Sequence, residues 1–236
     1  MTRRSRIAVL AGALGALGIF DILLGPALIH AGVVSPMLGF QWLFGIGLLE
    51  AVVGLAVGLF ALYRTRAGAG RGGRGFAWFG IGAGLAAVAI LALASRPGAG
   101  LPAINDITTD PEDPPAFSAT DRDMSYPAES FAPQQRSAYP DLEPIRVSST
   151  PDRALALAKE TAESLGWEIL SVDPAAGRLE AREVSRIFQF VDDIVVRVRP
   201  MAAGAVIDVR SKSRDGRGDL GENAKRIRAF AAAIPR

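Results

Sequence analysis

The sequence predicts a region of three transmembrane helices followed by one α+β domain, in which about four antiparallel strands carry two helices on one face. Three apolar stretches fill the first hundred residues, and each has about the length that a helix needs to cross a bilayer. After residue 146, helical periodicity, strand alternation and turn residues follow within a segment long enough to enclose one core. The chain of 236 residues therefore divides into a membrane region (1–96), a connecting segment (97–145) and a domain (146–236).

The expected spans are residues 7–29, 40–62 and 76–94. Small residues recur four positions apart on each span: Gly12 and Ala16, Gly54 and Gly58, Gly80 and Gly84. In lipid, this spacing lets helices approach closely. We expect these faces to pack within one chain, and a homo-oligomer formed through one of them is the alternative.

Of the eight arginines that flank the spans, only Arg96 lies on one side, and seven lie on the other: Arg3, Arg4, Arg6, Arg64, Arg66, Arg71 and Arg74. Loops that stay in the cytoplasm collect Lys and Arg. The pattern predicts a multi-pass protein of the bacterial inner membrane, with a cytoplasmic N-terminus and a periplasmic or otherwise extracytoplasmic C-terminal domain. The basic start and Ala31 leave open the cleavage of the first span as a signal peptide, although its apolar run is long for one.

The loop between the second and third spans contains GxGxxG at residues 68–73. A dinucleotide site needs this motif between a strand and a helix, and here it lies between two spans. We interpret the loop as a cytoplasmic hairpin that touches anionic lipid.

Two carboxyl groups lie inside the spans at similar depth, Asp21 in the first and Glu50 in the second. Acids inside a membrane span usually indicate a functional site, such as a proton relay or an ion site. We favour a neutral or hydrogen-bonded pair that fixes helix packing, because buried carboxyls can stay protonated. The functional alternative is a small proton-linked unit that uses both acids.

Residues 97–145 form an acidic, proline-rich segment, which we call the arm. Between residues 101 and 144, nine acids face only two arginines, and eight prolines oppose regular structure. The segment also holds four aromatic residues: Phe117, Tyr126, Phe131 and Tyr139. A solvated tether would not need them, so we expect part of the arm to wrap around the domain.

The domain begins with a helix that Ser149 or Thr150 can cap, running from Pro151 to about residue 166. Four strands are expected at residues 167–172, 178–184, 187–199 and 205–213. A last helix opens at Asp219, with Glu222 at the spacing of a capping box.

Composition excludes several classes of chemistry. The chain has no cysteine, and its only histidine is His30 at the outer end of the first span, so the domain lacks thiolate zinc sites and histidine-based catalysis. Its mixed charges argue against nucleic-acid binding. We predict no cofactor, no metal site and no catalytic residue, and calcium binding by the acidic arm is disfavoured because regular ligand spacing is absent.

The second half of the domain carries a recognisable pattern, in which a phenylalanine-rich strand ends in paired aspartates and is followed by RSxSR, D-x-G-x-N and R-I. The matching residues are Phe188, Phe190, Asp192, Asp193, Arg210, Ser211, Ser213, Arg214, Asp219, Gly221, Asn223, Arg226 and Ile227. Together with residues 105–117, this pattern resembles the bacterial domain of unknown function 1499 family. Lys212 and Asp215 depart from it. The resemblance implies a membrane-associated domain without an established activity.

A turn at residues 200–204 would place Asp192 and Asp193 opposite residues 210–212. Alternation puts Asp192 on the same face of the strand as Ile194. Either a bulge interrupts the alternation, or the Asp192 carboxylate lies at the edge of the core. In the second case the carboxylate needs a hydrogen-bond or ion-pair partner. We favour a structural ion-pair network. The candidate binding residues of the alternative are Asp192, Asp193, Arg210, Ser211, Ser213, Arg214, Asp219, Asn223 and Arg226.

We therefore expect an exported domain that binds an envelope component, either a protein partner or an anionic lipid, with the lipid bilayer as its constant neighbour. Arginines and serines beside a helix N-terminus make a suitable seat for an anionic group. A carboxylate-dependent envelope hydrolase is the rival from another class. It is disfavoured because adjacent strand residues point to opposite faces and do not form a catalytic dyad.

Overall fold

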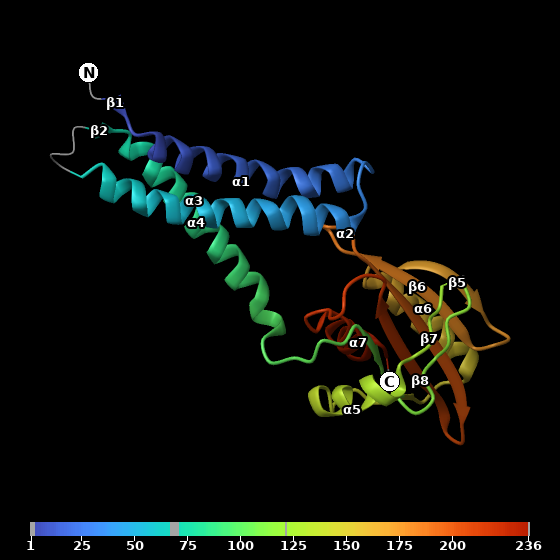
Figure 1. Cartoon of the computed structure of the whole chain (residues 1–236). Coiled ribbons are helices and arrows are strands. Elements are labelled where there is room, and N and C mark those ends of the chain that lie inside the picture. Colours follow the sequence, from blue (N-terminus) through green and yellow to red (C-terminus); the bar gives the residue numbers. More distant parts are fainter. Residues whose placement is uncertain (1–2, 67–70, 121, 236) are drawn as a thin grey trace. The chain divides into compact units, whose positions relative to one another are not determined.

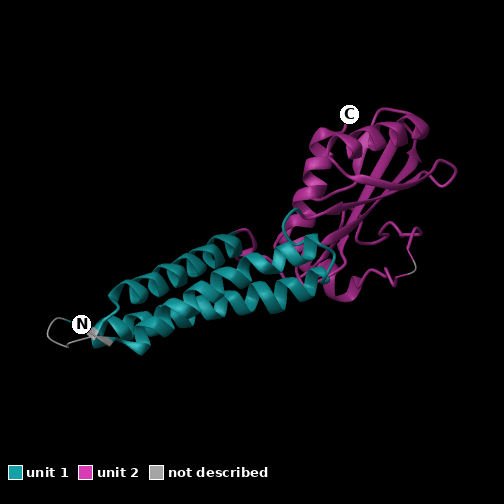
Figure 2. Ribbon diagram, turned by 90° about the horizontal axis from the view of Figure 1, so that it is seen from above, with its two compact units in different colours: residues 1–96, 186–189 teal, residues 97–185, 190–236 magenta. Residues whose placement is uncertain are grey.

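The computed structural model describes residues 3–66, 71–120 and 122–235 (Figure 1). The chain forms two compact units, residues 1–96 with 186–189 and residues 97–185 with 190–236 (Figure 2). Residues 68–70 of the GxGxxG motif lie outside the described residues.

The first unit confirms the expectation of three spans. Its helical segments Arg6–His30, Pro36–Arg64 and Arg74–Gly98 are each long and apolar enough to cross a membrane. The corresponding elements are α1 (Arg6–His30), α2 (Pro36–Leu38), the π-helical η1 (Gly39–Phe44), α3 (Gly45–Arg64), α4 (Arg74–Ser95) and the 3₁₀ turn η2 (Arg96–Gly98). A short parallel pair, β1 (Arg3–Arg4) with β2 (Arg71–Gly72), joins the two arginine-rich segments.

Glycines set the contacts between these helices. A Cβ added at Gly58 would stand 2.7 Å from the Ala77 carbonyl oxygen, and one at Gly84 would stand 2.5 Å from the Ala51 carbonyl oxygen. Both distances are too short for any other residue without a backbone shift. The small-residue spacing thus serves packing within the chain at these positions.

The second unit contains one antiparallel sheet with the order β3-β8-β7-β6-β5, and β4 also pairs with β8. Its strands are β3 (Asp106–Thr108), β4 (Ile145–Val147), β5 (Glu168–Asp173), β6 (Arg178–Val184), β7 (Val191–Met201) and β8 (Gly204–Ser213). The class matches the prediction, but the sheet has six strands rather than about four. The two additional strands, β3 and β4, are too short to show an alternating pattern in the sequence.

Helices α6 (Pro151–Ser164) and α7 (Glu222–Ala233) pack on one face of this sheet, which we call the inner face (Figure 1). The core beneath them includes Leu179, Ile194 and Phe230, all fully buried. The Phe230 ring stacks on Trp167 with centroids 5.3 Å apart. The Thr150 hydroxyl accepts a hydrogen bond from the Arg153 N–H and caps α6, as the sequence predicts.

Two boundaries differ from the prediction. β7 begins at Val191 rather than at residue 187, because residues 185–190 form a tight turn in which Gln189 has φ +51°. The Ser185 N–H donates to the Phe190 carbonyl in this turn, so Phe188 and Phe190 precede the strand. α7 begins at Glu222, after Gly221 in the left-handed region, and not at Asp219.

The arm contains more regular structure than its prolines suggest. It includes β3 and the helix α5 (Ala128–Ala138), which tolerates Pro133 in its interior. Of its four aromatic residues, Tyr139 is 3% exposed and Phe131 packs against the core. The arm is therefore attached to the domain at several points along its length.

Candidate functional site

The predicted cluster does not form one site, because the alternation of strand residues divides it between the two faces of the sheet. In the register of β7 and β8, Asp193 pairs with Lys212, and Asp192 pairs with Ser213. The inner-face group comprises Asp192, Ser211, Ser213, Asp219, Asn223 and Arg226, and the group on the opposite, outer face comprises Asp193, Arg210 and Arg214.

Arg226 of α7 is the centre of the inner-face group. Its Nη2 donates to Asp192 Oδ2 at 2.7 Å, and its Nε donates to Glu183 Oε2 at 2.5 Å. Its Nη1 donates to Ser211 Oγ at 3.0 Å. Asp192 thus enters the core edge, as alternation predicts, and its partner comes from the last helix rather than from β8.

Asn223 joins α7 to the sheet. Its side chain is fully buried, and its Oδ1 accepts from Ser211 Oγ at 2.6 Å. Its Nδ2 donates to Ser213 Oγ at 2.9 Å and to the Asn105 carbonyl at 3.1 Å. The amide therefore holds the helix, strand β8 and the start of the arm together.

Asp219 caps α7 from outside the helix. Its Oδ1 and Oδ2 accept from the main-chain N–H groups of Gly221 at 2.9 Å and Asn223 at 2.7 Å. Burial raises the pKa of the Asp219 carboxyl, while these two hydrogen bonds act in the opposite direction. The helix N-terminus is thus already occupied by a carboxylate of the chain itself.

Arg210 dominates the outer face. Its side chain is 2% exposed and forms a bidentate pair with Asp106 of β3, at 2.8 Å from Nε and 2.7 Å from Nη2. The guanidinium also donates to the main-chain carbonyls of Pro115 and Met124, at 3.1 Å and 2.6 Å. Its carbon Cζ lies 5.1 Å from the centroid of the Phe117 ring and 5.4 Å from that of Tyr126. All these partners belong to the arm.

Glu180 of β6 holds another part of the arm and was not singled out from the sequence. The residue is 2% exposed, and its carboxylate accepts from Ser118 N and Ser118 Oγ at 2.8 Å and 2.6 Å, and from Ala119 N at 2.9 Å. Its position between Leu179 and Ala181 indicates an outward-facing strand residue. No sequence signal indicates that a chain segment covers it.

A third contact between the arm and the outer face of the sheet involves Arg197, Arg199 and the fully buried Asp208. Asp208 Oδ2 accepts from Arg197 Nε at 3.1 Å and from Arg199 Nε at 2.9 Å, and both arginines also bind Asp110 of the arm. Burial raises the pKa of the Asp208 carboxyl, and the arginines oppose this shift. Among the described residues, Asp208 Oδ1 is one of the few buried polar atoms without a hydrogen-bond partner.

Arg214 is the most accessible of the predicted arginines. It forms a bidentate pair with Asp193, at 2.8 Å from Nε and 2.7 Å from Nη2, and its side chain is 27% exposed. Asp192 and Asp193 therefore face opposite sides of the sheet, and each carboxylate is bound by a different arginine. Asp192 and Asp193 therefore do not form a pair for acid–base chemistry with each other.

Two hollows border the arm. One, of about 510 Å³, lies beside α5 and is lined by Thr109, Pro111, Glu112, Gln135, Arg136, Tyr139, Pro140, Leu142, Glu143, Pro144 and Arg146. We call it the α5 hollow. The other, of about 330 Å³, lies over Arg210, Phe117 and Tyr126. Within residues 3–66, 71–120 and 122–235, no group of three or more His, Asp and Glu side chains could hold a metal ion.

The intramembrane acids Asp21 and Glu50 meet where α1 crosses α3. A Cβ added at Gly47 would stand 3.0 Å from Asp21 Cβ, and Glu50 follows Gly47 by one helical turn. In the described part of the chain, Glu50 Oε2 is a buried atom without a hydrogen-bond partner.

These features define a class of protein, in which helices able to span a membrane precede an α+β domain whose outer sheet face is covered by its own arm. Residues 106–234 match the family model described as "Protein of unknown function (DUF1499)", which is more than half of the chain. The chain therefore belongs to the DUF1499 family. The match begins at Asp106, the partner of Arg210, so residues 106–145 of the arm are part of the family domain. A comparison with curated proteins finds no match.

Proposed function

We propose that the protein is a membrane-anchored binding protein whose C-terminal domain binds a segment of a partner protein outside the cytoplasm. The α5 hollow carries this proposal. Its floor includes Tyr139 and Leu142, and its charged residues are two acids and two arginines: Glu112, Glu143, Arg136 and Arg146. Thr109 and Gln135 also line the hollow, so polar groups dominate its lining and converge on one concave site, as polar groups do in ligand sites.

The charge of the α5 hollow favours a protein partner over an anionic lipid. The two signs balance, whereas a headgroup phosphate would be favoured by an excess of arginine. A peptide segment presents N–H donors, carbonyl acceptors and side chains of both signs, which suits such a lining. Within the hollow, Arg136 pairs with Glu112, and both side chains are exposed. Arg210 and Arg226 each have several partners within the chain and are largely buried.

The proposal is tested by photo-crosslinking in cells, with a photoreactive phenylalanine at Glu143. Both Glu143 and Arg146 are exposed. We expect one discrete protein adduct, which the additional substitution Arg146→Ala weakens and the substitution Arg153→Ala on α6 does not. The matched control is the same probe at Glu160 on α6, where no such adduct should form. Lipid adducts alone, or equal adducts at both positions, would refute binding of a protein segment by the α5 hollow.

The proposed orientation places this domain on the side of the membrane opposite the arginine-rich loop. The chain has no cysteine, so a single cysteine at the exposed Ser148 can be labelled without background. We expect an impermeant maleimide to label Ser148→Cys in intact cells. Labelling only after lysis would reverse the orientation and move the search for partners to the cytoplasm.

The Asp21 and Glu50 pair supports a second candidate function, a small proton-linked unit, because Glu50 Oε2 is buried without a partner among the described residues. This function predicts that Asp21→Asn and Glu50→Gln cells grow differently from wild-type cells as external pH changes. If the double variant grows like the wild type at every pH, the pair serves only to pack the helices, and this second function is refuted.

A further inference from the structure

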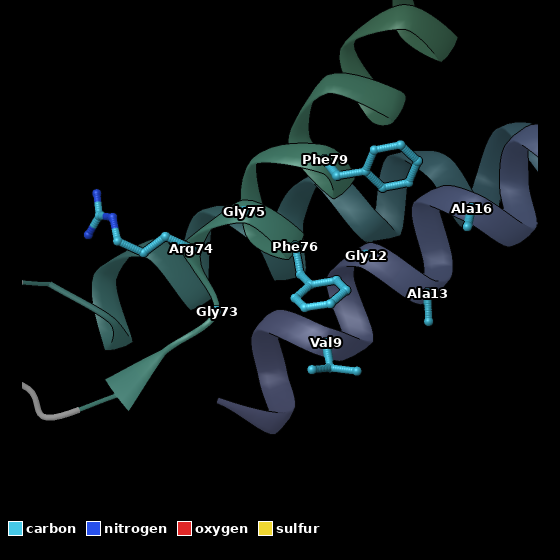
Figure 3. Close-up of a pocket in the computed structure, with 9 residues that line it drawn as sticks. All are labelled: Val9, Gly12, Ala13, Ala16, Gly73, Arg74, Gly75, Phe76 and Phe79. Carbon is cyan, nitrogen blue, oxygen red and sulfur yellow. The ribbon is translucent and has the colours of Figure 1, made fainter. Parts of the chain in front are cut away.

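An open groove runs along the surface of the first unit between α1 and α4 (Figure 3). Its volume is about 670 Å³. Val9, Ala13 and Ala16 of α1 form one side, and Phe76 and Phe79 of α4 form the other. Arg74 lies at one end, at the start of α4.

The groove exists because small residues of α1 face large residues of α4. Gly12 allows a close approach here, since a Cβ added there would stand 3.0 Å from Phe76 Cδ1. Ala13 and Ala16 are exposed beside it and do not fill the space. The Phe76 and Phe79 rings remain 40% and 49% exposed, so they present apolar walls to whatever lies outside the helices.

The end of the groove is basic. Arg4 Cζ lies 5.8 Å from the centroid of the Phe76 ring. Arg74 also lines this end, but its side chain points away from Phe76 (Figure 3), and its Nη1 donates to the Thr65 carbonyl at 3.2 Å. The pairing of β1 with β2 holds Arg4 there, since the neighbouring Ser5 N–H donates to the Gly72 carbonyl at 2.9 Å. The sequence has no acid in residues 1–20 or 51–105. No nearby acid in these segments therefore neutralises the two arginines.

We infer that this groove binds one anionic phospholipid, with an acyl chain along Ala13 and Ala16 and the phosphate at Arg4, while Arg74 adds a second positive charge nearby. From Val9 to Ala16 the helix rises about 10 Å, which matches the upper part of an acyl chain. Guanidinium groups bind phosphate through charge-assisted hydrogen bonds. The site lies in the membrane unit and is independent of the α5 hollow.

A helix of a second copy is the other occupant that fits an apolar groove. In a symmetric parallel pair, however, it would bring a second Arg4 and Arg74 to the same level, and like charges would repel. Charge complementarity therefore favours the anionic lipid over a dimer.

The inference is tested by native mass spectrometry of the full chain in detergent, with phosphatidylglycerol and phosphatidylcholine of identical acyl chains added in equal amounts. We expect one retained phosphatidylglycerol, preferred over phosphatidylcholine by about tenfold, which corresponds to a binding free-energy difference of about 1.4 kcal/mol. Arg4→Gln with Arg74→Gln should abolish the preference. The matched control is Arg96→Gln, which removes an arginine at the other end of α4.

A second pair of variants tests the groove itself. Ala16→Phe should fill the space between α1 and α4 and lower lipid retention about tenfold, whereas Ala89→Phe, at an exposed position of α4 outside the groove, should not. Equal retention of the two lipids by the wild type would overturn the inference, as would retention by Ala16→Phe that equals retention by Ala89→Phe. A dimer that only Ala16→Phe dissociates would identify a second copy as the occupant instead.

Discussion

The two faces of the domain's sheet are covered through different kinds of contact. Helices α6 and α7 cover the inner face, and the contact is largely apolar, with Leu179, Ile194 and Phe230 fully buried. The irregular arm covers much of the outer face, where the buried residues include Glu180, Asp193, Asp208 and Arg210.

The two faces differ because helices and irregular segments differ in how many of their main-chain groups need hydrogen-bond partners. A helix satisfies its own main-chain hydrogen bonds, so it can present apolar side chains to a sheet. An irregular segment has unpaired N–H and C=O groups, and burying them without partners costs about 1–3 kcal/mol each. Charged strand residues supply those partners here: Glu180 accepts from the N–H groups of Ser118 and Ala119, and Arg210 donates to the carbonyls of Pro115 and Met124.

The largest effect is expected on the inner face. Phe230→Ala removes a fully buried ring that stacks on Trp167, and we expect a loss of about 3–5 kcal/mol in the free energy of unfolding. The measurement is urea unfolding of the full chain in detergent, followed by Trp167 fluorescence in a Trp42→Phe, Trp78→Phe background. The arm and the sheet should unfold together, since both depend on this core.

On the outer face, Arg210→Met should cost about 3 kcal/mol, the lower end for breaking a buried ion pair, because Met keeps part of the packing of the arginine stem. Unlike Phe230→Ala, this variant should release the arm first. Limited proteolysis would then cut residues 107–126 at urea concentrations where Trp167 is still native. Adding Asp106→Asn removes the unpaired charge and should restore more than half of the loss. If the arm and the sheet unfold at the same urea concentration in Arg210→Met, the arm does not unfold independently of the sheet.

Glu180→Gln is a milder change of the same face. The amide keeps one acceptor oxygen for the N–H groups of Ser118 and Ala119 but loses the negative charge, so we expect a loss of about 1–3 kcal/mol. The same proteolysis assay should detect earlier cleavage near Ser118. If cleavage is unchanged, Glu180 does not hold the arm.

Alkaline pH should loosen the arm through Tyr126. Burial raises the pKa of this phenol to about 12, and the charge of Asp106 adds to the shift. Its ordinary value is about 10, so the folded state holds this proton more tightly than the unfolded state. The resulting stability is fully present below pH 10 and is lost as pH rises through about 12. Urea midpoints between pH 10 and 12 should fall more steeply for the wild type than for Tyr126→Phe.

The smallest effect is expected at the exposed pair of Arg182 and Glu168. Arg182 Nε and Nη2 donate to the Glu168 carboxylate at 2.8 Å and 2.7 Å, which resembles the geometry of Arg210, but solvent reaches both side chains. Arg182→Gln should cost less than about 1 kcal/mol. A cost as large as that of Arg210→Met would mean that burial does not decide the contribution of these pairs.

The inner face could largely be predicted from the sequence, and the outer cover could not. Helical period identifies Ile227 and Phe230, and alternation places Asp192 at the core edge. Arg210 could be recognised as a candidate, but its partner Asp106 lies 104 residues away in a segment without periodicity. Glu180 has the pattern of an ordinary solvent-facing strand residue. Contacts made by an irregular segment depend on its path, and no local sequence signal predicts that path.

The pairing of β3 with β8 also has a consequence for biosynthesis. Asp106 of β3 pairs with Lys212 of β8, so a ribosome makes the arm well before β8. The acceptors and donors that the arm needs from β8 do not yet exist while the intervening residues are made. Contacts between distant segments form slowly because a long loop must close first. A chain that is interrupted before residue 204 cannot form β8 and leaves its acidic arm open to proteases. We therefore expect proteases to cleave the arm of a chain that lacks β8 sooner than the arm of the full chain.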